Sequence, residues 1–300
     1  MNVQKWLAAN TAPLAGQRVA LTGATGGLGR ELCFYLAGLG AELILLDRSR
    51  EKAQALDAAL RAAFPAVSIR RIFVELTDMD SVRAACTALA PLHPQVLILN
   101  AGAYAIPRHR STAGYDDVFQ IDFVSPYYMV RALLPAMPDG GRVVAVGSIA
   151  HRYSVSDPAD VDFSTRRACS KVYGNAKRYL MAGLYALFRG QTRVTLAVVH
   201  PGVTFTNITA HYPKWLFALI RRPMQWIFMP PRVAALSLLR GVFCPCGDRE
   251  WIGPWLLDVW GRPRRSRLRS LPPDECRRIG ETAERIWQQL QPAAAPVKTE

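Results

Sequence analysis

Short apolar segments alternate with longer segments of helical periodicity from Arg18 onward, and this alternation constrains the fold more than any other feature. The apolar segments are rich in Val, Ile and Leu and mostly end at Gly, Asn, Asp or Pro. They occupy Arg18–Thr22, Glu42–Leu46, Ser68–Val74, Val96–Leu99, Arg142–Val146 and Val194–Val199. Strands that are apolar on both faces are typical of a parallel sheet covered by helices. We therefore expect repeated βαβ units.

The intervening segments carry apolar residues at a spacing of three and four, which predicts crossover helices. These segments are Leu28–Leu39, Arg50–Phe64, Ser81–Leu89, Tyr115–Leu134 and Val172–Phe188. No internal repeat or change of composition appears before Pro201, and half of the residues are hydrophobic. We expect an α/β fold: a single doubly wound domain over residues 17–290, with a mostly parallel sheet of about seven strands. Residues 1–16 are expected to be an N-terminal extension and residues 291–300 a disordered tail.

A glycine-rich loop follows the first apolar segment. It reads Thr22, Gly23, Ala24, Thr25, Gly26, Gly27, Leu28, Gly29 and opens a predicted helix. Glycines at such a turn let the backbone approach a pyrophosphate, and the helix N-terminus supplies free N–H groups. The spacing differs from the common G-x-G-x-x-G fingerprint, so an ordinary strand-to-helix turn is the alternative. Asp47, eighteen residues after Gly29, stands where a carboxylate meets the adenosine ribose, which favours a dinucleotide site.

Asp47 and its neighbour Arg48 give opposite indications of which dinucleotide binds. A carboxylate accepts hydrogen bonds from a ribose 2′-hydroxyl and repels a 2′-phosphate, whereas a guanidinium pairs with that phosphate. Because Asp47 ends the predicted strand and Arg48 can point to solvent, we expect NAD as the cofactor, with NADP as the alternative.

Three further motifs follow in order along the chain. Asn100-Ala101-Gly102 follows the fourth predicted strand, Ser148 follows the fifth, and the segment Tyr173 to Lys177 reads YGNAK. With the glycine loop before them, they make residues 14–207 resemble the short-chain dehydrogenase/reductase family. Ser148 to His151, the YGNAK segment and His200-Pro201-Gly202 are most similar to the retinol dehydrogenase branch. The resemblance implies a Rossmann-type oxidoreductase that interconverts a lipophilic alcohol and its ketone or aldehyde.

Tyr173 and Lys177 are four residues apart and therefore neighbours on one helical face. A phenol can move the proton at the substrate oxygen if an ammonium favours its ionised form, because free tyrosine titrates near ~10. Ser148, at the carboxyl edge of the sheet, could polarise the same oxygen. Each residue alone fits an ordinary core, surface or turn position, but their joint placement favours catalysis. A second frame at Ser170-Lys171 has Arg167 where tyrosine is needed.

Asp122 occupies a position where the family usually has an asparagine that helps hold a water in a proton relay. The setting, Phe119 to Phe123, matches the family pattern, so the substitution is real. A carboxylate can hold water too, and it can oppose the effect of Lys177 on the phenol. We expect Asp122 to tune the pH optimum, with the sign left open.

The resemblance assigns further residues to the cofactor. It places Asn100, Ala101 and Gly102 beside the adenosine half, and Glu75, followed by Leu76, near the adenine. It places Pro201, Gly202 and Thr206 on the nicotinamide side, together with Tyr173 and Lys177. As an alternative, Asn100 and Gly202 could serve only as loop residues.

The segment from about residue 207 to residue 230 is aromatic and apolar and includes Trp215, Phe217 and Trp226. In the family such a segment caps the substrate. An apolar cap implies a lipophilic substrate, because burial of apolar area drives binding and excludes water. Steroid, retinoid and fatty alcohols or carbonyls are the expected classes. Internal packing and contact with lipid are the alternatives for this segment.

The formal net charge of +14 is concentrated in patches, of which Arg262 to Arg269 is the densest. No aromatic platform accompanies this run, so nucleic acid is not an expected partner. A solvated surface segment and peripheral contact with an anionic membrane are the two interpretations. No signal peptide and no apolar segment near the ~20 residues of a spanning helix is apparent, so we expect a cytoplasmic protein.

The six cysteines lack the two-pair spacing of a zinc site, so no metal is expected. His151 and His200 are interpreted as packing or hydrogen-bonding residues, since tyrosine fills the acid/base role. A homodimer through a helix pair is common in the family. Two rival functions remain: a dinucleotide-binding regulatory protein with weak turnover, motivated by Asp122, and a sugar-nucleotide epimerase.

Overall fold

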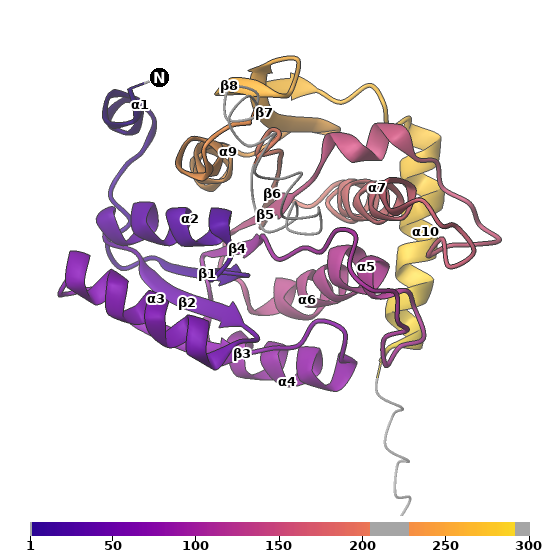
Figure 1. Ribbon diagram of the computed structural model, residues 1–300, viewed down its shortest axis with the longest axis horizontal. Helices are drawn as coiled ribbons and strands as arrows, with labels where there is room; N and C mark the ends of the chain where they lie inside the picture. Colours follow the sequence, from indigo (N-terminus) through magenta and orange to yellow (C-terminus); the bar gives the residue numbers. More distant parts are fainter. Residues whose placement is uncertain (1, 205–227, 292–300) are drawn as a thin grey trace, which may run out of the picture.

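The computed structural model describes residues 2–204 and 228–291 (Figure 1). Thr206, nearly all of the predicted lid and residues 292–300 of the predicted tail lie outside these ranges. None of the described helices is both long enough and apolar enough to cross a bilayer.

The central sheet has eight strands in the order β3-β2-β1-β4-β5-β6-β7-β8. Each neighbouring pair is parallel except β7 and β8. The strands are β1 (Arg18–Thr22), β2 (Glu42–Asp47), β3 (Ile69–Phe73), β4 (Val96–Leu99), β5 (Arg142–Val146), β6 (Thr195–Val199), β7 (Glu250–Leu256) and β8 (Trp260–Arg267). The six predicted strands are present, and the last two raise the count to eight instead of about seven. The strand order reverses between β1 and β4, where open α/β sheets form a ligand crevice at their carboxyl edge.

Helices cover both faces of the sheet, as expected for a doubly wound fold (Figure 1). The helices are α1 (Val3–Asn10), α2 (Gly27–Gly38), α3 (Arg50–Ala63), α4 (Met79–Leu89), α5 (Asp117–Phe119), α6 (Ser125–Leu133), α7 (Cys169–Leu187), α9 (Pro231–Phe243) and α10 (Pro273–Gln289). One apolar core joins one face of the sheet to α1, α2, α3 and α9. A second core joins the other face to α4, α6, α7 and α10. The fold class is thus confirmed.

The arginine-rich run near the C-terminus forms an edge strand. Arg262 to Arg267 lie on β8, which pairs with β7 in an antiparallel hairpin. A strand at the open edge of a sheet is typically charged, because charge discourages pairing with another chain. The arginines of this run are therefore on the surface, and the run is also a strand of the sheet.

Residues 3–10, inside the predicted extension, form helix α1 with a buried Trp6. Asn2 caps this helix through its side chain, which accepts a hydrogen bond from the Lys5 amide at 3.0 Å. Arg240 of α9 donates to the Asn10 side chain at 2.7 Å. The N-terminal segment therefore packs on the same face as α2 and α9.

Candidate active site

A hollow of about 490 Å3 opens at the carboxyl edge beside the glycine loop, within the size range of ligand pockets. All predicted residues of the adenosine half line it: Thr22, Gly23, Thr25, Gly26, Gly27, Leu28, Gly29, Asp47, Arg48, Glu75, Leu76, Asn100, Ala101 and Gly102. Sequence reasoning missed Lys52 and Tyr104, which also line it. A lysine in the first turn of a helix and a tyrosine in a loop carry no spacing that could have identified them.

Hydrogen bonds tie the glycine loop to the loop after β4. The Asn100 side chain donates to the carbonyl oxygens of Thr22 and Gly23, both at 3.0 Å. The Thr22 hydroxyl accepts from the amides of Asn100 and Ala101 at 3.0 and 3.1 Å. At Gly29, any Cβ would lie 2.2 Å from the Gly23 carbonyl oxygen, so the turn into α2 requires glycine. These contacts fix the position of the glycine loop relative to the loop after β4.

Asp47 is engaged within the protein and is only 4% exposed. Its Oδ1 accepts hydrogen bonds from the amide and hydroxyl of Thr25, both at 2.9 Å. Its Oδ2 lies 2.5 Å from the Arg71 guanidinium, which also binds Asp57 at 2.6 Å. This carboxylate therefore braces the glycine loop against β3, and both of its oxygens are used.

The side chains that reach from β2 and α3 toward the open part of the hollow are cationic. The Arg48 side chain is 75% exposed and lies 3.8 Å from the Glu75 carboxylate in a loose ion pair. Lys52, in the first turn of α3, lines the same hollow. This end of the site can therefore bind an anionic group.

The predicted catalytic residues come together from three elements. Ser148 follows β5 and caps a short helix, Ile149–Tyr153, by accepting a hydrogen bond from the Ala150 amide at 3.2 Å. Tyr173 and Lys177 lie on α7, with the lysine Nζ 5.7 Å from the centre of the phenol ring. Asp122 lies in a turn of π-helix, Gln120–Val124, between α5 and α6. Such turns frequently occur at functional sites.

Lys177 and Asp122 form a buried ion pair. Nζ lies 2.8 Å from Oδ1, and the two side chains are 3% and 0% exposed. Nζ also donates to the Val146 carbonyl oxygen at 2.9 Å, while Oδ2 accepts from the Ala103 amide at 3.0 Å. The pair thus connects α7, β5 and the loop after β4. Asp122 holds the lysine directly, with no water between them.

The electrostatics at Tyr173 differ from those expected of a tyrosine beside a lone lysine. Burial raises the pKa of the Tyr173 phenol; Lys177 lowers it, Asp122 raises it, and a hydrogen bond with Ser148 lowers it, with a net rise. Burial lowers the pKa of Lys177, but Asp122 and Tyr173 outweigh burial, so the lysine keeps its proton more firmly. Burial likewise raises the pKa of Asp122 against the opposing effect of Lys177. The phenol therefore lies beside a lysine whose charge is largely balanced.

A buried network supports the backbone of Ser148. His151 Nδ1 lies 2.5 Å from the Ser148 carbonyl oxygen, which requires a proton on Nδ1, and Nε2 then accepts from the Ser270 hydroxyl at 2.6 Å. Arg178, next to Lys177, donates to the His151 carbonyl oxygen at 2.9 Å and binds Glu275 of α10 at 2.5 Å. His151 is thus a hydrogen-bonding residue, as expected. The sequence offered no signal for Arg178 and Glu275, which are 97 positions apart.

On the predicted nicotinamide side, Pro201 and Gly202 follow β6. The amide of Val203 donates to the Val259 carbonyl oxygen at 3.4 Å, so this loop lies against the end of the β7–β8 hairpin. His200 is buried and stacks on Trp251, with ring centres 5.2 Å apart. This histidine is therefore a packing residue.

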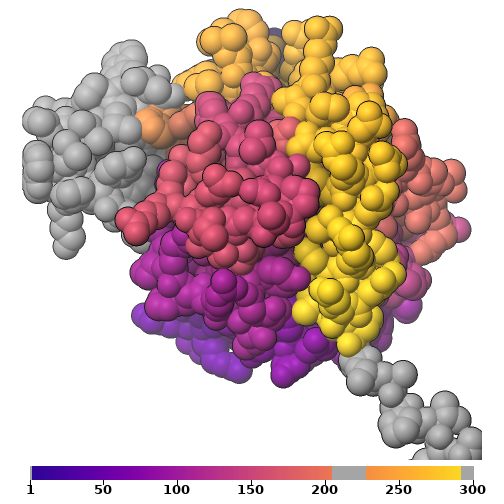
Figure 2. Space-filling model, turned by 90° about the vertical axis from the view of Figure 1, so that its right-hand side faces the viewer, coloured from indigo at the N-terminus to yellow at the C-terminus, as the bar shows by residue number. Residues whose placement is uncertain are grey.

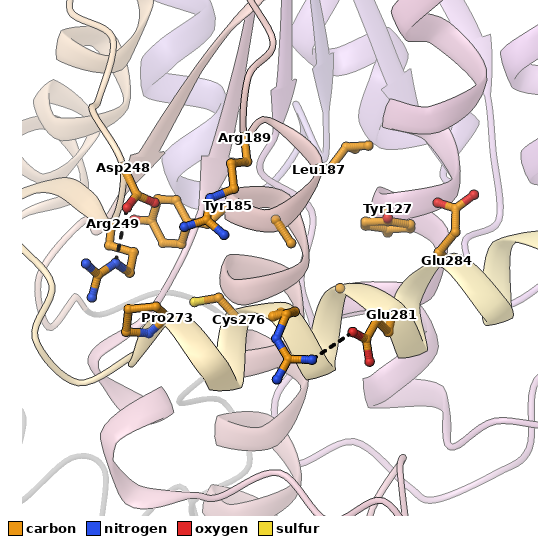
Figure 3. A pocket seen from close by; sticks show the side chains of 13 residues that line it. Tyr127, Tyr185, Leu187, Arg189, Asp248, Arg249, Pro273, Cys276, Glu281 and Glu284 are labelled. Carbon is orange, nitrogen blue, oxygen red and sulfur yellow. Dashed lines mark hydrogen bonds and ion pairs between the residues drawn. The ribbon is translucent and has the colours of Figure 1, made fainter.

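A second hollow, of about 340 Å3, lies between α10 and the C-terminal half of α7 (Figure 3). Tyr127, Tyr185, Cys276 and Glu281 are among its lining residues. No residue of the glycine loop lines it, whereas the glycine loop lines the hollow at the carboxyl edge. The cofactor is therefore assigned to the hollow at the carboxyl edge, which Tyr104 joins to the Tyr173 ring.

The family model described as short chain dehydrogenase matches residues 17–216, which is two thirds of the chain. Dehydrogenase/reductase SDR family member 13 of Bos taurus is 30% identical over 92% of this chain and 73% of its own length. Polyprenol dehydrogenase of Mus musculus is 29% identical over 80% of this chain and 75% of its own. Retinol dehydrogenase 14 of Mus musculus is 29% identical over 71% of this chain and 69% of its own length. The sequence similarity therefore extends beyond the short motifs.

Two solved structures share the fold. A putative uncharacterized protein from Mycobacterium paratuberculosis superposes with a TM-score of 0.77 at 22% identity, covering 94% of this chain and 97% of its own. A blue fluorescent protein from a metagenomic library, in complex with NADPH, has a TM-score of 0.58 at 25% identity, covering 77% and 94%.

Proposed function

Since the chain belongs to the short-chain dehydrogenase family and is an NAD(P)-dependent oxidoreductase, we propose that it interconverts a lipophilic alcohol and the corresponding ketone or aldehyde. In this proposal Tyr173 is the acid/base. The observation that carries the proposal is the meeting of Ser148, Tyr173 and Lys177 at the carboxyl edge, beside the hollow lined by the glycine loop. A proton-moving phenol and a dinucleotide site are thus adjacent.

Each residue has a defined task in this mechanism. The bound nicotinamide supplies the hydride acceptor or donor. In oxidation, Tyr173 takes the proton of the substrate hydroxyl, and Ser148, whose oxygen accepts from the Ala150 amide, donates its own proton toward the substrate oxygen. Lys177 donates to the Val146 carbonyl oxygen and forms an ion pair with Asp122, and with three N–H donors it can also donate to a ligand hydroxyl.

The lipophilic substrate class is supported by the relatives and by side chains near Tyr173. Two similar proteins are named for retinol and polyprenol, both apolar alcohols. Tyr104 packs its ring edge against Tyr173 at 5.3 Å, and Ile106 and Ile121 line the adjoining hollow. Steroid, retinoid and fatty alcohols remain the proposed classes.

We propose NADP in preference to NAD. Asp47, on which the expectation of NAD was based, has both carboxylate oxygens bound inside the protein. Arg48 and Lys52 are the cations at this end of the hollow, and a guanidinium pairs well with a 2′-phosphate. Removing Arg48 by Arg48→Ala should lower kcat/KM with NADPH by roughly tenfold or more and leave that with NADH nearly unchanged. An equal loss with both cofactors would refute the assignment.

Tyr173→Phe tests the central claim. The variant should lose turnover against a panel of steroid, retinoid and aliphatic alcohols while NADPH binding, followed by nucleotide fluorescence, stays intact. Turnover retained by the variant would sink the proposal.

A regulatory dinucleotide-binding protein is the second candidate, because burial raises the pKa of Tyr173 and Asp122 offsets part of the lowering by Lys177, so the ionised form of the phenol is disfavoured. Tight cofactor binding by the unmodified chain with no turnover on the whole panel would favour this candidate.

A further inference from the structure

The tip of the β7–β8 hairpin carries a leucine in an unfavourable setting. The Val259 amide donates to the Leu256 carbonyl oxygen at 2.9 Å and closes a tight turn with Leu257 and Asp258 at its centre. Both central residues have positive φ, 52° and 60°, a conformation that favours Asn and Gly. Leu257 is also 82% exposed. Contacts within the described residues therefore do not account for a leucine here, and such outliers point to function.

The hairpin and the segment after Ser148 carry the large exposed apolar side chains of the described residues. The large hydrophobic side chains that are exposed among residues 2–204 and 228–291 are Tyr153, Val155, Trp255, Leu256 and Leu257. We call these five the apolar tip. Arg152, next to Tyr153, binds Asp258 of the turn at 2.7 Å and so ties the two segments together. Trp255 packs on Gly261, where a Cβ would lie 2.3 Å from its ring, so this close contact requires glycine.

Two arginines of β8 lie opposite the strand that carries Trp255. Gly253 pairs with Arg264, so Arg264 lies on the side that bears Trp251. The register shift between Pro254 and Leu256 sets Gly261 and Arg262 opposite Trp255. Both arginines are exposed and have no carboxylate partner within the part of the chain that the structure describes. The hairpin thus carries both exposed apolar side chains and unpaired cationic groups.

The apolar tip lies at the same edge of the sheet as the active site. β7 is parallel to β6, so its last residues lie at the carboxyl edge, and the hairpin stands at the end of the sheet opposite β3 (Figure 1). Val259 of the turn binds the Val203 amide, just after Gly202. The helix that carries Tyr153 begins directly after Ser148.

We propose that the apolar tip, with Arg262 and Arg264, docks the protein on an anionic lipid bilayer. Trp is enriched at membrane–water interfaces, exposed leucines gain from leaving water, and arginines are attracted to anionic headgroups. The arginines on edge strand β8 disfavour pairing with a second copy, which would carry the same charges. Docking would turn the active-site edge toward the bilayer, so that a lipophilic substrate could enter from the lipid. Only this consequence rests on the proposed function.

Cosedimentation of the full chain with vesicles, without substrate or cofactor, tests the docking. The chain should bind vesicles of phosphatidylcholine with phosphatidylglycerol and bind phosphatidylcholine alone much less. Arg262→Gln with Arg264→Gln should weaken binding by about 30-fold at low salt. The matched control is Arg61→Gln with Arg70→Gln, two exposed arginines on α3 and β3, and it should bind like the unmodified chain.

Leu257→Asn separates docking from stability. Asparagine tolerates the left-handed conformation, so the variant should melt at the same or a higher temperature while its vesicle affinity falls about tenfold. Its turnover of a short, water-soluble alcohol should match that of the unmodified chain. The docking proposal is overturned by absence of vesicle binding, by equal binding to neutral vesicles, or by unchanged binding of Leu257→Asn. Self-association that Leu257→Asn abolishes would instead assign the apolar tip to contact between copies. If the unmodified chain bound vesicles but turned over none of the alcohols, that result would contradict the proposed function and leave the docking proposal standing.

Discussion

Asp122 and Lys177 place two opposite charges beside the phenol of Tyr173, at 2.8 Å from each other and almost fully buried. Burial is the largest cause of the raised pKa of Tyr173; Lys177 lowers this pKa, and Asp122 opposes the effect of Lys177. The pair also joins α7 to the loop after β4 through the Ala103 amide. Asp122 therefore has an electrostatic effect and a structural one, and an isosteric change separates them.

Asp122→Asn should shift the pH profile of alcohol oxidation toward lower pH. Removing the negative charge leaves the positive charge of Lys177 unopposed, so the pKa of Tyr173 falls and its basic form is present at lower pH. In the reductive direction the phenol donates a proton. There, activity should decline with rising pH, and the decline should begin at a lower pH in the variant than in the unmodified chain. Turnover measured as a function of pH provides the test, with the exposed Asp80→Asn as control. A profile unchanged in Asp122→Asn would remove Asp122 from this role.

The sequence predicted the residues whose relation is local and missed those whose relation is distant. Tyr173 and Lys177 are one helical turn apart, and the glycine loop is contiguous, so spacing identified both. Two ion pairs depend on tertiary contacts that no spacing encodes. Arg71 binds Asp47 from 24 residues away, and Arg178 binds Glu275. The close contact of Lys177 with Asp122 depends in the same way on how α7 packs beside the π-helical turn.

At the scale of elements, β1 to β6 were predictable because they are short and mostly apolar, whereas β7 and β8 were not. Strand β8 shows the reason. Its sequence, WGRPRRSR, has neither apolar runs nor apolar alternation, because as an edge strand it buries little. The pairing with β7 is visible only in the folded chain. The same reason explains why the hairpin tip could not be identified from the sequence.

The contact between α7 and the helix after Ser148 sets the catalytic geometry, and a pair of glycine substitutions tests it. A Cβ at Gly174 would lie 2.4 Å from the Ala150 carbonyl oxygen, whereas at Gly183 the nearest atoms are at 3.5 Å. Gly174→Ala should lower kcat by roughly 100-fold, because displacement of Tyr173 from Ser148 by about 1 Å misaligns the proton transfer. Gly183→Ala should keep its activity and gain up to about 1 kcal/mol of unfolding free energy from helix propensity. Equal activities of the two variants would contradict this account.

The two buried histidines next to Trp251 should make the protein sensitive to acid. Burial lowers the pKa of His200 to about 3 and that of His151 to about 4. The unfolded chain takes up protons near pH ~6.5 that the folded chain does not, so stability is complete above that pH and is lost as the pH falls. The unfolding free energy should decrease by about 3 to 4 kcal/mol between pH 7 and pH 5.

Denaturant unfolding at a series of pH values measures this dependence. His200→Gln should remove about half of it, while the exposed pair His93→Gln and His109→Gln should leave it in place. If the unfolding free energy of the unmodified chain were the same at pH 7 and pH 5, the folded chain would take up the protons on these histidines as readily as the unfolded chain, which would contradict the prediction.

At the scale of the whole molecule, α10 packs on α7 and α6. Every residue of α7 from Gly174 to Tyr185 is buried, because α7 packs between the sheet and α10. The yellow C-terminal segment that contains α10 lies across the surface on this side of the molecule (Figure 2). α10 is also fixed to α6, through the ion pair of Arg131 with Glu284 at 2.8 Å and the stacking of Trp287 on Tyr128 at 4.6 Å. The hollow of Figure 3 interrupts this contact only locally.

We therefore expect the chain to be a monomer in solution, contrary to the homodimer that the family resemblance suggested. A second copy could reach α7 only by displacing α10, which would expose the apolar side chains of Cys276, Ile279, Ala283 and Ile286 and break the buried pair of Arg178 with Glu275. Removing one partner of such a pair alone costs about 3 to 5 kcal/mol. Sedimentation equilibrium over a range of protein concentrations, without lipid, should give the mass of one chain. A dimer that persists on dilution and survives Leu257→Asn would contradict the prediction and would require a surface other than α6, α7 and the apolar tip.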